Sequence, residues 1–190
     1  MAVKPHPHFD EIKAALQKLS KKGEAFTGIC YRCAEPQFAD QIVSGLGSQL
    51  HGARWTPRNS FPAAYLSDTA EAALQEFLAR ARRMKLPDHK SLPLVMVWVK
   101  LKISNLLNTT EAEVAAVINP LLETDKIHWR AIQDRREGVS QAIGRAVHEI
   151  CFSGLIAPSQ ASPEAKTIVI FPQKLKAPET LSAPSLNPIA

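Results

Sequence analysis

Residues 92–103 constrain the fold most, because two kinds of residue alternate strictly through the middle of this segment. One series consists of the apolar residues Val95, Val97, Val99 and Leu101. Between them stand Met96, Trp98, Lys100 and Lys102. A period of two places successive side chains on opposite faces of a strand. This segment is therefore the clearest strand of the chain, and we expect a fold built on a sheet.

Weaker patterns account for most of the remaining chain. Further strands are predicted at residues 26–33, 63–67, 154–158 and 167–171, and helices at 8–22, 38–46, 68–84, 110–122, 126–136 and 138–152. Gly23 is expected to end the first helix, and Asp68, three residues before Glu71, to cap the third. Residues 48–62 are rich in Gly, Pro, Asn and Ser, which predicts a loop.

Strands and helices mix without a regular βαβ repeat, which favours an α+β fold over a doubly wound sheet. A chain of 190 residues is long enough for one domain with a hydrophobic core. We expect a helical extension over residues 1–24, a single core domain over 25–172, and a flexible Pro-containing tail over 173–190.

The composition excludes several classes of protein. No run of about 18 apolar residues is present, so we expect no membrane-spanning helix. The first ten residues lack an apolar signal region, which makes the cytoplasm the expected compartment. Cys30 and Cys33 lie three apart in a predicted strand and should point to opposite faces, so no metal site is expected.

The net charge of +5 indicates an anionic ligand or partner. Basic residues cluster only on two predicted helices, at residues 18–22 and 80–83, where we interpret them as solvated faces. Aromatic residues do not interleave these clusters, so direct, specific binding to nucleic acid is not expected. A smaller anion, such as the diphosphate of a dinucleotide, accounts for the positive charge equally well.

Motifs with a more specific meaning lie in three stretches of the chain. The first is Tyr31-Arg32. The second holds residues 52–57 (GARWTP), 65–67 (YLS) and 72–76 (AALQE). The third holds residues 140–145 (SQAIGR), 154–159 (GLIAPS) and 169–172 (VIFP). Taken in this order, the motifs resemble the RES family, which is named for its Arg, Glu and Ser residues, and the resemblance spans residues 29–172.

The resemblance implies a fold like that of the ADP-ribosyltransferases, with a mixed sheet core and flanking helices. RES proteins are toxins of toxin–antitoxin pairs that consume NAD+ by hydrolysis or phosphorolysis, and an Xre-type antitoxin holds them inactive. The expected ligand is therefore NAD+ as a substrate, without a metal. The acceptor of the ADP-ribose group stays open between water, phosphate and a protein, and a homo-oligomer is also open.

Matching the motifs residue by residue assigns the expected site. The candidate catalytic residues are Glu76, Arg32 and Ser159, and the candidate NAD+-binding residues are Arg54, Tyr65, Tyr31 and Trp55. A carboxylate such as Glu76 stabilises the oxocarbenium-like state formed when the nicotinamide–ribose bond breaks. Arginine forks bind a diphosphate, an aromatic face suits the cationic nicotinamide ring, and a serine hydroxyl can donate to the ribose or the amide.

Five of the seven candidates also have a plainer interpretation. Glu76 is four residues before Arg80 and could form an exposed ion pair on a helix. Ser159 could only cap a turn. The Arg54 and Trp55 side chains could stack on each other in a loop, and Tyr31 could belong to the core.

Three departures from the family pattern bear on activity. Thr56 stands where the family has Asn, and residues 58–61 (RNSF) lack the usual glycine; we expect both near the mouth of the pocket. Residues 105–110 (NLLNTT) also differ from the family, and this change is interpreted as structural.

Two other functions remain open from the sequence. One is an ADP-ribosyltransferase that modifies a protein, because the same pocket would serve transfer and hydrolysis. The other is a non-catalytic basic module in a DNA-binding toxin–antitoxin complex.

Overall fold

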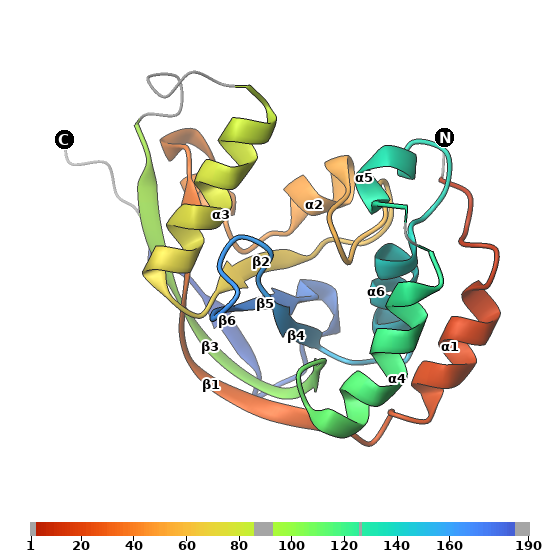
Figure 1. Cartoon of the computed structure of the whole chain (residues 1–190). Helices are drawn as coiled ribbons and strands as arrows, with labels where there is room; N and C mark the ends of the chain where they lie inside the picture. Colours follow the sequence, from red (N-terminus) through yellow and green to blue (C-terminus); the bar gives the residue numbers. More distant parts are fainter. Residues whose placement is uncertain (1–2, 86–92, 126, 185–190) are drawn as a thin grey trace.

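A computed structural model describes residues 3–85, 93–125 and 127–184 (Figure 1). Its centre is a six-stranded sheet in the order β1-β2-β5-β4-β3-β6, in which β1 also pairs with β3. The strands are β1 (Gly23–Ala34), β2 (Ala64–Ser67), β3 (Val95–Asn108), β4 (Gly154–Pro158), β5 (Lys166–Ile170) and β6 (Thr180–Ser182). Because β1 also pairs with β3, the strands β1, β2, β5, β4 and β3 form a closed ring of pairings.

Helices surround this sheet, which confirms the predicted single-domain α+β architecture. They are α1 (Phe9–Gln17), α2 (Leu46–His51), α3 (Ala70–Arg83), α4 (Ala112–Glu123), α5 (Trp129–Ile132) and α6 (Val139–Glu149), with the 3-10 turns η1 (Pro36–Gln41) and η3 (Pro172–Lys174). In Figure 1, α1, α4 and α6 lie together on one side, and α3 stands apart on the other.

The strand alternation divides the buried apolar residues between two clusters. In β4, Leu155 belongs to the cluster that α1, α4 and α6 cover, and its neighbour Ile156 belongs to the cluster on the other face. In β3 the predicted alternation is observed from Val95 onward, with Val97 to Ile103 buried at every second position. Leu92, the first residue of that predicted strand, lies outside the described residues.

Several helix boundaries differ from those predicted. Gly23 does not end the first helix: α1 ends at Gln17 and Gly23 begins β1. The predicted helix at 38–46 is replaced by η1 and by α2, which extends into the predicted loop. The N-cap of α3 is Thr69, whose side chain accepts a hydrogen bond from Ala72 N, so Asp68 lies one residue too early.

The predicted flexible tail is wrong for residues 173–184, which fold onto the sheet. β6 pairs antiparallel with residues 100–102 of β3. The Glu179 carboxylate accepts hydrogen bonds from Ser104 N and Oγ, both at 2.7 Å, and from Ser153 Oγ. A proline-rich composition does not reveal an edge strand or a carboxylate anchor, because both depend on partners far away in the chain.

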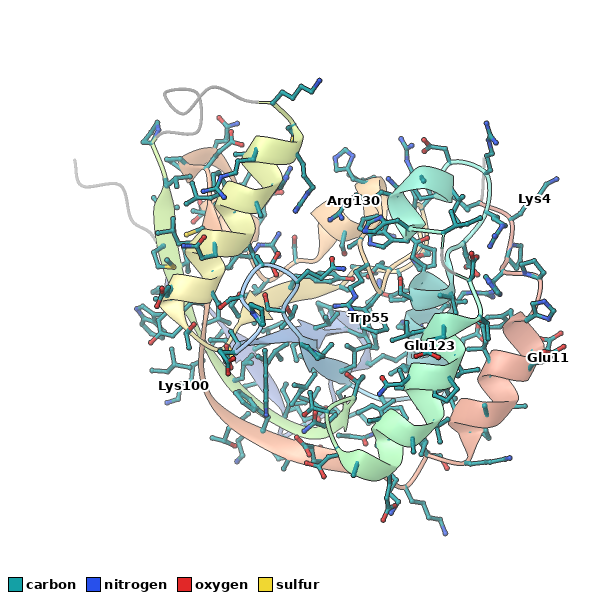
Figure 2. All side chains as sticks on the ribbon, in the orientation of Figure 1. Lys4, Glu11, Trp55, Lys100, Glu123 and Arg130 are labelled. Carbon is teal, nitrogen blue, oxygen red and sulfur yellow. The ribbon has the colours of Figure 1, made fainter. Side chains whose placement is uncertain are left out.

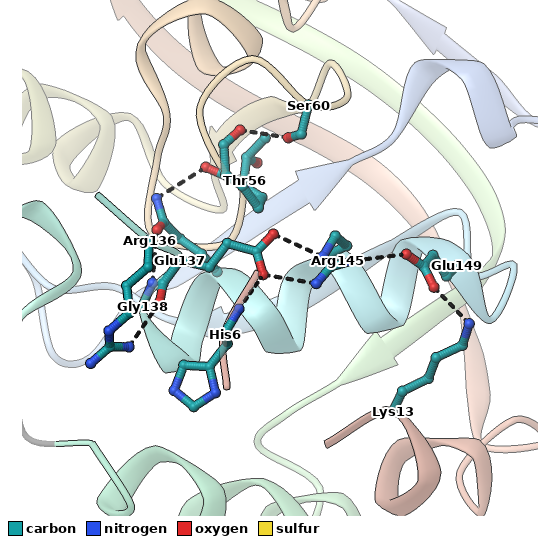
Figure 3. A network of polar contacts seen from close by, with 11 residues as sticks. His6, Lys13, Thr56, Ser60, Arg136, Glu137, Gly138, Arg145 and Glu149 are labelled. Carbon is teal, nitrogen blue, oxygen red and sulfur yellow. Dashed lines mark hydrogen bonds and ion pairs between the residues drawn. The ribbon is translucent and has the colours of Figure 1, made fainter. Parts of the chain in front are cut away.

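The N-terminal segment is also attached to the domain rather than separate from it. His6 N donates to Glu137, which is 4% exposed, and Glu137 N donates to Lys4 O. Figure 3 shows the network continuing from Glu137 through Arg145 and Glu149. It ends at Lys13 of α1, whose Nζ lies 2.6 Å from Glu149. These contacts fix the segment that links α5 to α6.

Candidate active site

A cavity of about 810 Å³ lies between α3 on one side and α2 and α5 on the other (Figure 1). Its volume falls in the upper part of the range for small-molecule sites. Six of the seven predicted site residues line it, namely Tyr31, Arg32, Arg54, Trp55, Tyr65 and Glu76. The seventh, Ser159, contacts Glu76 directly.

The floor of the cavity is a row of hydroxyl-bearing residues on three neighbouring strands. Tyr31 of β1 lies opposite Ser67 of β2, and Ser67 lies opposite Thr167 of β5. Residues directly opposite one another place their side chains on the same face of a sheet. All three residues line the cavity, so Tyr31 belongs to the site rather than to the core.

Glu76 projects from α3 and is held from the loop that follows β4. Ser159 Oγ donates to Glu76 Oε1 at 2.6 Å, and Ala161 N donates to the same oxygen at 3.3 Å. The other oxygen, Oε2, accepts no hydrogen bond from the described residues. Among the described residues, Glu76 forms no ion pair with Arg80. The alternative that Glu76 only forms an exposed ion pair on a helix therefore does not describe its contacts.

Ser159 combines the two roles considered for it. Its hydroxyl hydrogen is directed to Glu76, and its oxygen accepts hydrogen bonds from Ala161 N and Ser162 N, both at 3.2 Å. A hydroxyl has one donor and two acceptor positions, and here all three are used. Ser159 therefore caps a turn and orients the carboxylate, with nothing left to donate to a ligand.

The loop that carries Arg54 is held against α6 by the motif at residues 140–145. Gln141 is fully buried, and its Nε2 donates to Ala53 O at 3.1 Å and to Thr56 O at 3.3 Å. Gly144 lets the loop approach, because a Cβ there would lie 1.8 Å from Trp55 O. This spacing of Gln and Gly places both residues on one helix face.

Tyr65 secures the same loop from the sheet. Its hydroxyl accepts a hydrogen bond from Trp55 N at 3.0 Å and shares one with Thr56 Oγ1 at 2.9 Å. Burial raises the pKa of Tyr65, so the phenol stays protonated at neutral pH. Its backbone oxygen accepts from Arg32 NH1 at 3.1 Å, which ties Arg32 to β2.

Trp55 does not offer its ring to a ligand, although it was grouped with the binding residues. The residue is 1% exposed and belongs to the core cluster under α6, and Figure 2 shows it in the interior of the molecule. The Arg54 guanidinium lies 4.8 Å from its ring centroid. This is the stacking interpretation of Arg54 and Trp55, and it leaves Arg54 as the side chain that faces the cavity.

The two sequence departures predicted near the mouth of the pocket lie elsewhere. Thr56 is fully buried and hydrogen-bonds to Tyr65. In the following loop, Phe61 stacks on His148 at 4.0 Å, and Arg58 pairs with Asp134. Neither Thr56 nor residues 58–61 line the cavity. Both departures therefore act on the packing behind the site.

The sequence interpretation missed the part of the wall formed by the end of α3 and by α5. Arg80 and Arg83 line the cavity with Glu76, whereas they were interpreted as solvated. Spacings of four and seven residues from Glu76 place all three on one helix face, and this signal was available in the sequence. Arg130 and Trp129 of α5 face them, with Arg130 over the Trp129 ring at 4.3 Å (Figure 2).

The cavity is strongly positive. Five arginines line it, against one carboxylate from Glu76. In residues 3–85, 93–125 and 127–184, none of these arginines forms an ion pair within 4.0 Å, and they are Arg32, Arg54, Arg80, Arg83 and Arg130.

Burial and neighbouring positive charges lower the pKa values of the arginines in the cavity. Burial, with a contribution from Arg80, lowers the pKa of Arg32 to about 10. Burial and the neighbouring Arg83 lower the pKa of Arg130, and Glu76 opposes that shift. The guanidinium groups stay protonated at neutral pH, so the cavity attracts anions.

No group of three or more His, Cys, Asp or Glu residues in the described part of the chain could hold a metal ion. No described helix is long and apolar enough to cross a membrane.

Comparison with known proteins gives three likenesses. A family model for the RES domain matches residues 29–186. Two curated relatives named NAD(+) phosphorylase MbcT, from Mycobacterium tuberculosis and Mycobacterium bovis, are each 26% identical over 147 residues, covering 76% of this chain and 74% of the relative. A chain of the M. tuberculosis MbcT–MbcA toxin–antitoxin complex superposes with a TM-score of 0.64 at 20% identity, covering 91% of both chains, and shares the fold.

The match to the family model covers most of the chain and includes all seven candidate site residues. It also includes Arg80, Arg83 and Arg130, which the structure adds to the site. The likeness in fold extends the agreement to nearly the whole length. The chain belongs to the RES domain family.

Proposed function

We propose that this chain cleaves NAD+ at the nicotinamide–ribose bond, as the toxin of a toxin–antitoxin pair. The observation that carries the proposal is the Glu76 carboxylate, held through Oε1 by Ser159 and open at Oε2, in a cavity lined by five arginines. The relatives named NAD(+) phosphorylase support the same substrate.

Glu76 is the residue assigned to catalysis. Cleavage builds positive charge on the ribose as the C–N bond lengthens, and a fixed carboxylate stabilises this charge without reorganising. Oε1 is anchored, so Oε2 is the oxygen directed to the ribose. Nicotinamide leaves as a neutral molecule with the bonding electron pair, so its departure needs no second acid. Ser159 acts through Glu76 and is a positioning residue.

The walls supply the binding groups. Arg54, Arg83 and Arg130 line the cavity and bind the diphosphate, and Arg83 is close enough to Arg130 to lower its pKa. The aromatic faces of Tyr31 and Tyr65 lie on the floor and receive the nicotinamide ring. Tyr65 also fixes the loop of Arg54, so its ring and its hydroxyl have separate tasks.

The acceptor and the partner follow from the relatives. The name NAD(+) phosphorylase favours inorganic phosphate over water or a protein as acceptor. The solved toxin–antitoxin complex favours an antitoxin as partner, for which we propose the Xre type and a position that closes the cavity. Expression in the cytoplasm, where NAD+ and phosphate are abundant, is part of the same proposal.

The test follows NAD+ and free nicotinamide over time with the purified chain. Glu76→Gln keeps the size of the side chain and removes its charge, and we expect nicotinamide release to fall by at least about 100-fold. Glu71→Gln is the matched control, because Glu71 lies on the same helix but outside the cavity, and it should retain full activity.

Three outcomes decide the proposal. Release by the unmodified chain and loss in Glu76→Gln alone support it. Equal release by both proteins would overturn the role of Glu76. No release by a folded chain, together with label from NAD+ retained on a protein of a lysate, would favour ADP-ribosyl transfer instead.

A further inference from the structure

A short helix carries one of the arginines of the cavity. α5 is four residues long, Trp129–Ile132, and brings Arg130 to a cavity that four other arginines also line. Burial and then the neighbouring Arg83 lower the pKa of Arg130, so the two guanidinium groups repel each other. Contacts elsewhere in the molecule are therefore needed to hold α5 beside the cavity.

Trp129 links α5 to the start of α6. The residue is 7% exposed, and the Arg130 guanidinium lies 4.3 Å from its ring centroid. Trp129 packs against Gly138, the N-cap of α6, where an added Cβ would lie 2.9 Å from Trp129 Cα. The position of Arg130 therefore depends on the position of Gly138.

The N-terminal segment anchors the residue before Gly138. His6 N donates to Glu137 Oε2 at 3.1 Å (Figure 3), and Glu137 N donates to Lys4 O at 2.9 Å. Lys4 also forms a parallel β-bridge with Arg136. Residues 4–6 therefore hold the end of the segment that contains α5, residues 127–136, which we call the α5 segment.

The His6 side chain reaches the beginning of the α5 segment. Its Nε2 lies 3.6 Å from Asp125 Oδ2, and Asp125 Oδ1 accepts a hydrogen bond from Ile127 N at 3.0 Å. Burial and then Arg136 lower the pKa of His6 against the opposing effect of Asp125, so the ring is neutral at pH 7. Its Nδ1 accepts a hydrogen bond from His8 N, which leaves the ring hydrogen on Nε2, directed to Asp125.

We propose that residues 4–6 are a positioning element of the site, which holds the α5 segment at both ends and thereby fixes Arg130 for the diphosphate of NAD+. The inference rests on the proposed function, and it adds residues that precede the match to the family model, which begins at residue 29. His6 contacts both ends of the α5 segment but does not line the cavity. Its loss should therefore weaken binding of the diphosphate and leave the chemical step at Glu76 unchanged.

His6→Leu tests the contact, because leucine has a similar size but no hydrogen-bond donor. It should raise the KM for NAD+ about fivefold, with kcat changed less than about twofold, since NAD+ must then order the α5 segment as it binds. His6→Gln, whose amide nitrogen can replace Nε2, should keep the KM within about twofold of the unmodified chain. His8→Leu is the matched control in the same segment, because the His8 side chain is 64% exposed, and it should leave kcat and KM unchanged.

A double-mutant cycle separates positioning from a general loss of stability. In the Arg130→Gln background, His6→Leu should change the KM for NAD+ by less than about twofold, because the group that His6 positions is already absent. The same cycle is measured without turnover as the Kd for ADP, which carries a diphosphate and lacks nicotinamide. Asp125→Asn weakens the same contact from its other side, and it replaces His6→Leu in both measurements if His6→Leu does not fold.

The outcomes separate this inference from the proposed function. If the unmodified chain releases no nicotinamide but binds ADP with the expected coupling between His6 and Arg130, the proposed function fails and the positioning role stands. If His6→Leu leaves the KM and the Kd unchanged, or weakens binding equally with and without the Arg130 side chain, the positioning role is wrong. A chain that neither releases nicotinamide nor binds ADP would overturn both.

Discussion

Two groups of arginines in this molecule have opposite surroundings. Arg145 of α6 forms a two-pronged contact with the buried Glu137 (Figure 3). Arg136 lies 2.8 Å from Asp125. In the cavity, five arginines crowd together without an ion pair among the described residues. Paired charges hold the N-terminal segment to the domain, whereas unpaired charges weaken the fold slightly and leave the site ready for an anion.

The largest effect is expected where the paired region is broken. Arg145→Ala leaves Glu137, which is 4% exposed, without its main partner, and an uncompensated buried charge is costly. The free energy of unfolding should fall by about 3 kcal/mol in denaturant titrations. Arg135→Ala, at an exposed arginine outside these networks, should change it by less than about 0.5 kcal/mol. A loss below about 1 kcal/mol in Arg145→Ala would mean that the pairing is not what holds this region.

A smaller effect is expected from pH in the packed region. His148 stacks on Phe61 and meets Phe171 edge-on, and its Nε2 is buried without a partner. Burial, with a further contribution from Lys174, lowers the pKa of His148 from 6.5 to about 4, against the opposing effect of Glu149.

The unfolded chain binds the proton of this histidine first as the pH falls, so stability decreases between pH 6.5 and pH 4 and is unaffected above that window. Allowing for partial exposure, we expect a loss on the order of 1 kcal/mol by pH 5. Chemical denaturation across this range measures the loss. His148→Gln should flatten the slope, and a slope that persists unchanged would assign the titration to another group.

The smallest effect on stability is expected in the cavity. Arg83→Gln removes a charge that has no partner and that repels Arg130, so the free energy of unfolding should change by less than about 0.5 kcal/mol. The same variant should raise the KM for NAD+ about tenfold, through the lost contact to the diphosphate. Arg82→Gln should change neither quantity. A clear loss of stability in Arg83→Gln would contradict the distinction between the two groups of arginines.

The predictable parts of the fold are those with a local cause. Alternation identified β3, apolar segments identified β4 and β5, and capping-box spacing identified α3, which carries Glu76. The predicted helix boundaries were wrong where they rested on a single residue. Gly23 begins a strand instead of ending a helix, because β1 pairs with β3 from its first residue.

The site divides in the same way. Motif matching predicted that Glu76 and Arg54 share one site, and both line the cavity. It did not reveal that the Ser159 hydroxyl donates its hydrogen bond to Glu76, which lies 83 residues earlier in the chain. It also took Trp55 for a binding residue, because a motif says nothing about which side of a loop faces the core.

The sequence by itself determined the family, the α+β class and the residue types of the site, since these depend on short motifs and on periodicity. Only the tertiary structure decided which charges are paired, because a pairing depends on contacts between residues distant in the chain. Arg145 and Arg83 each lie on a predicted helix, and neither sequence neighbourhood shows whether the charge is paired. Burial of Glu137 beside one and the cavity beside the other give them different tasks.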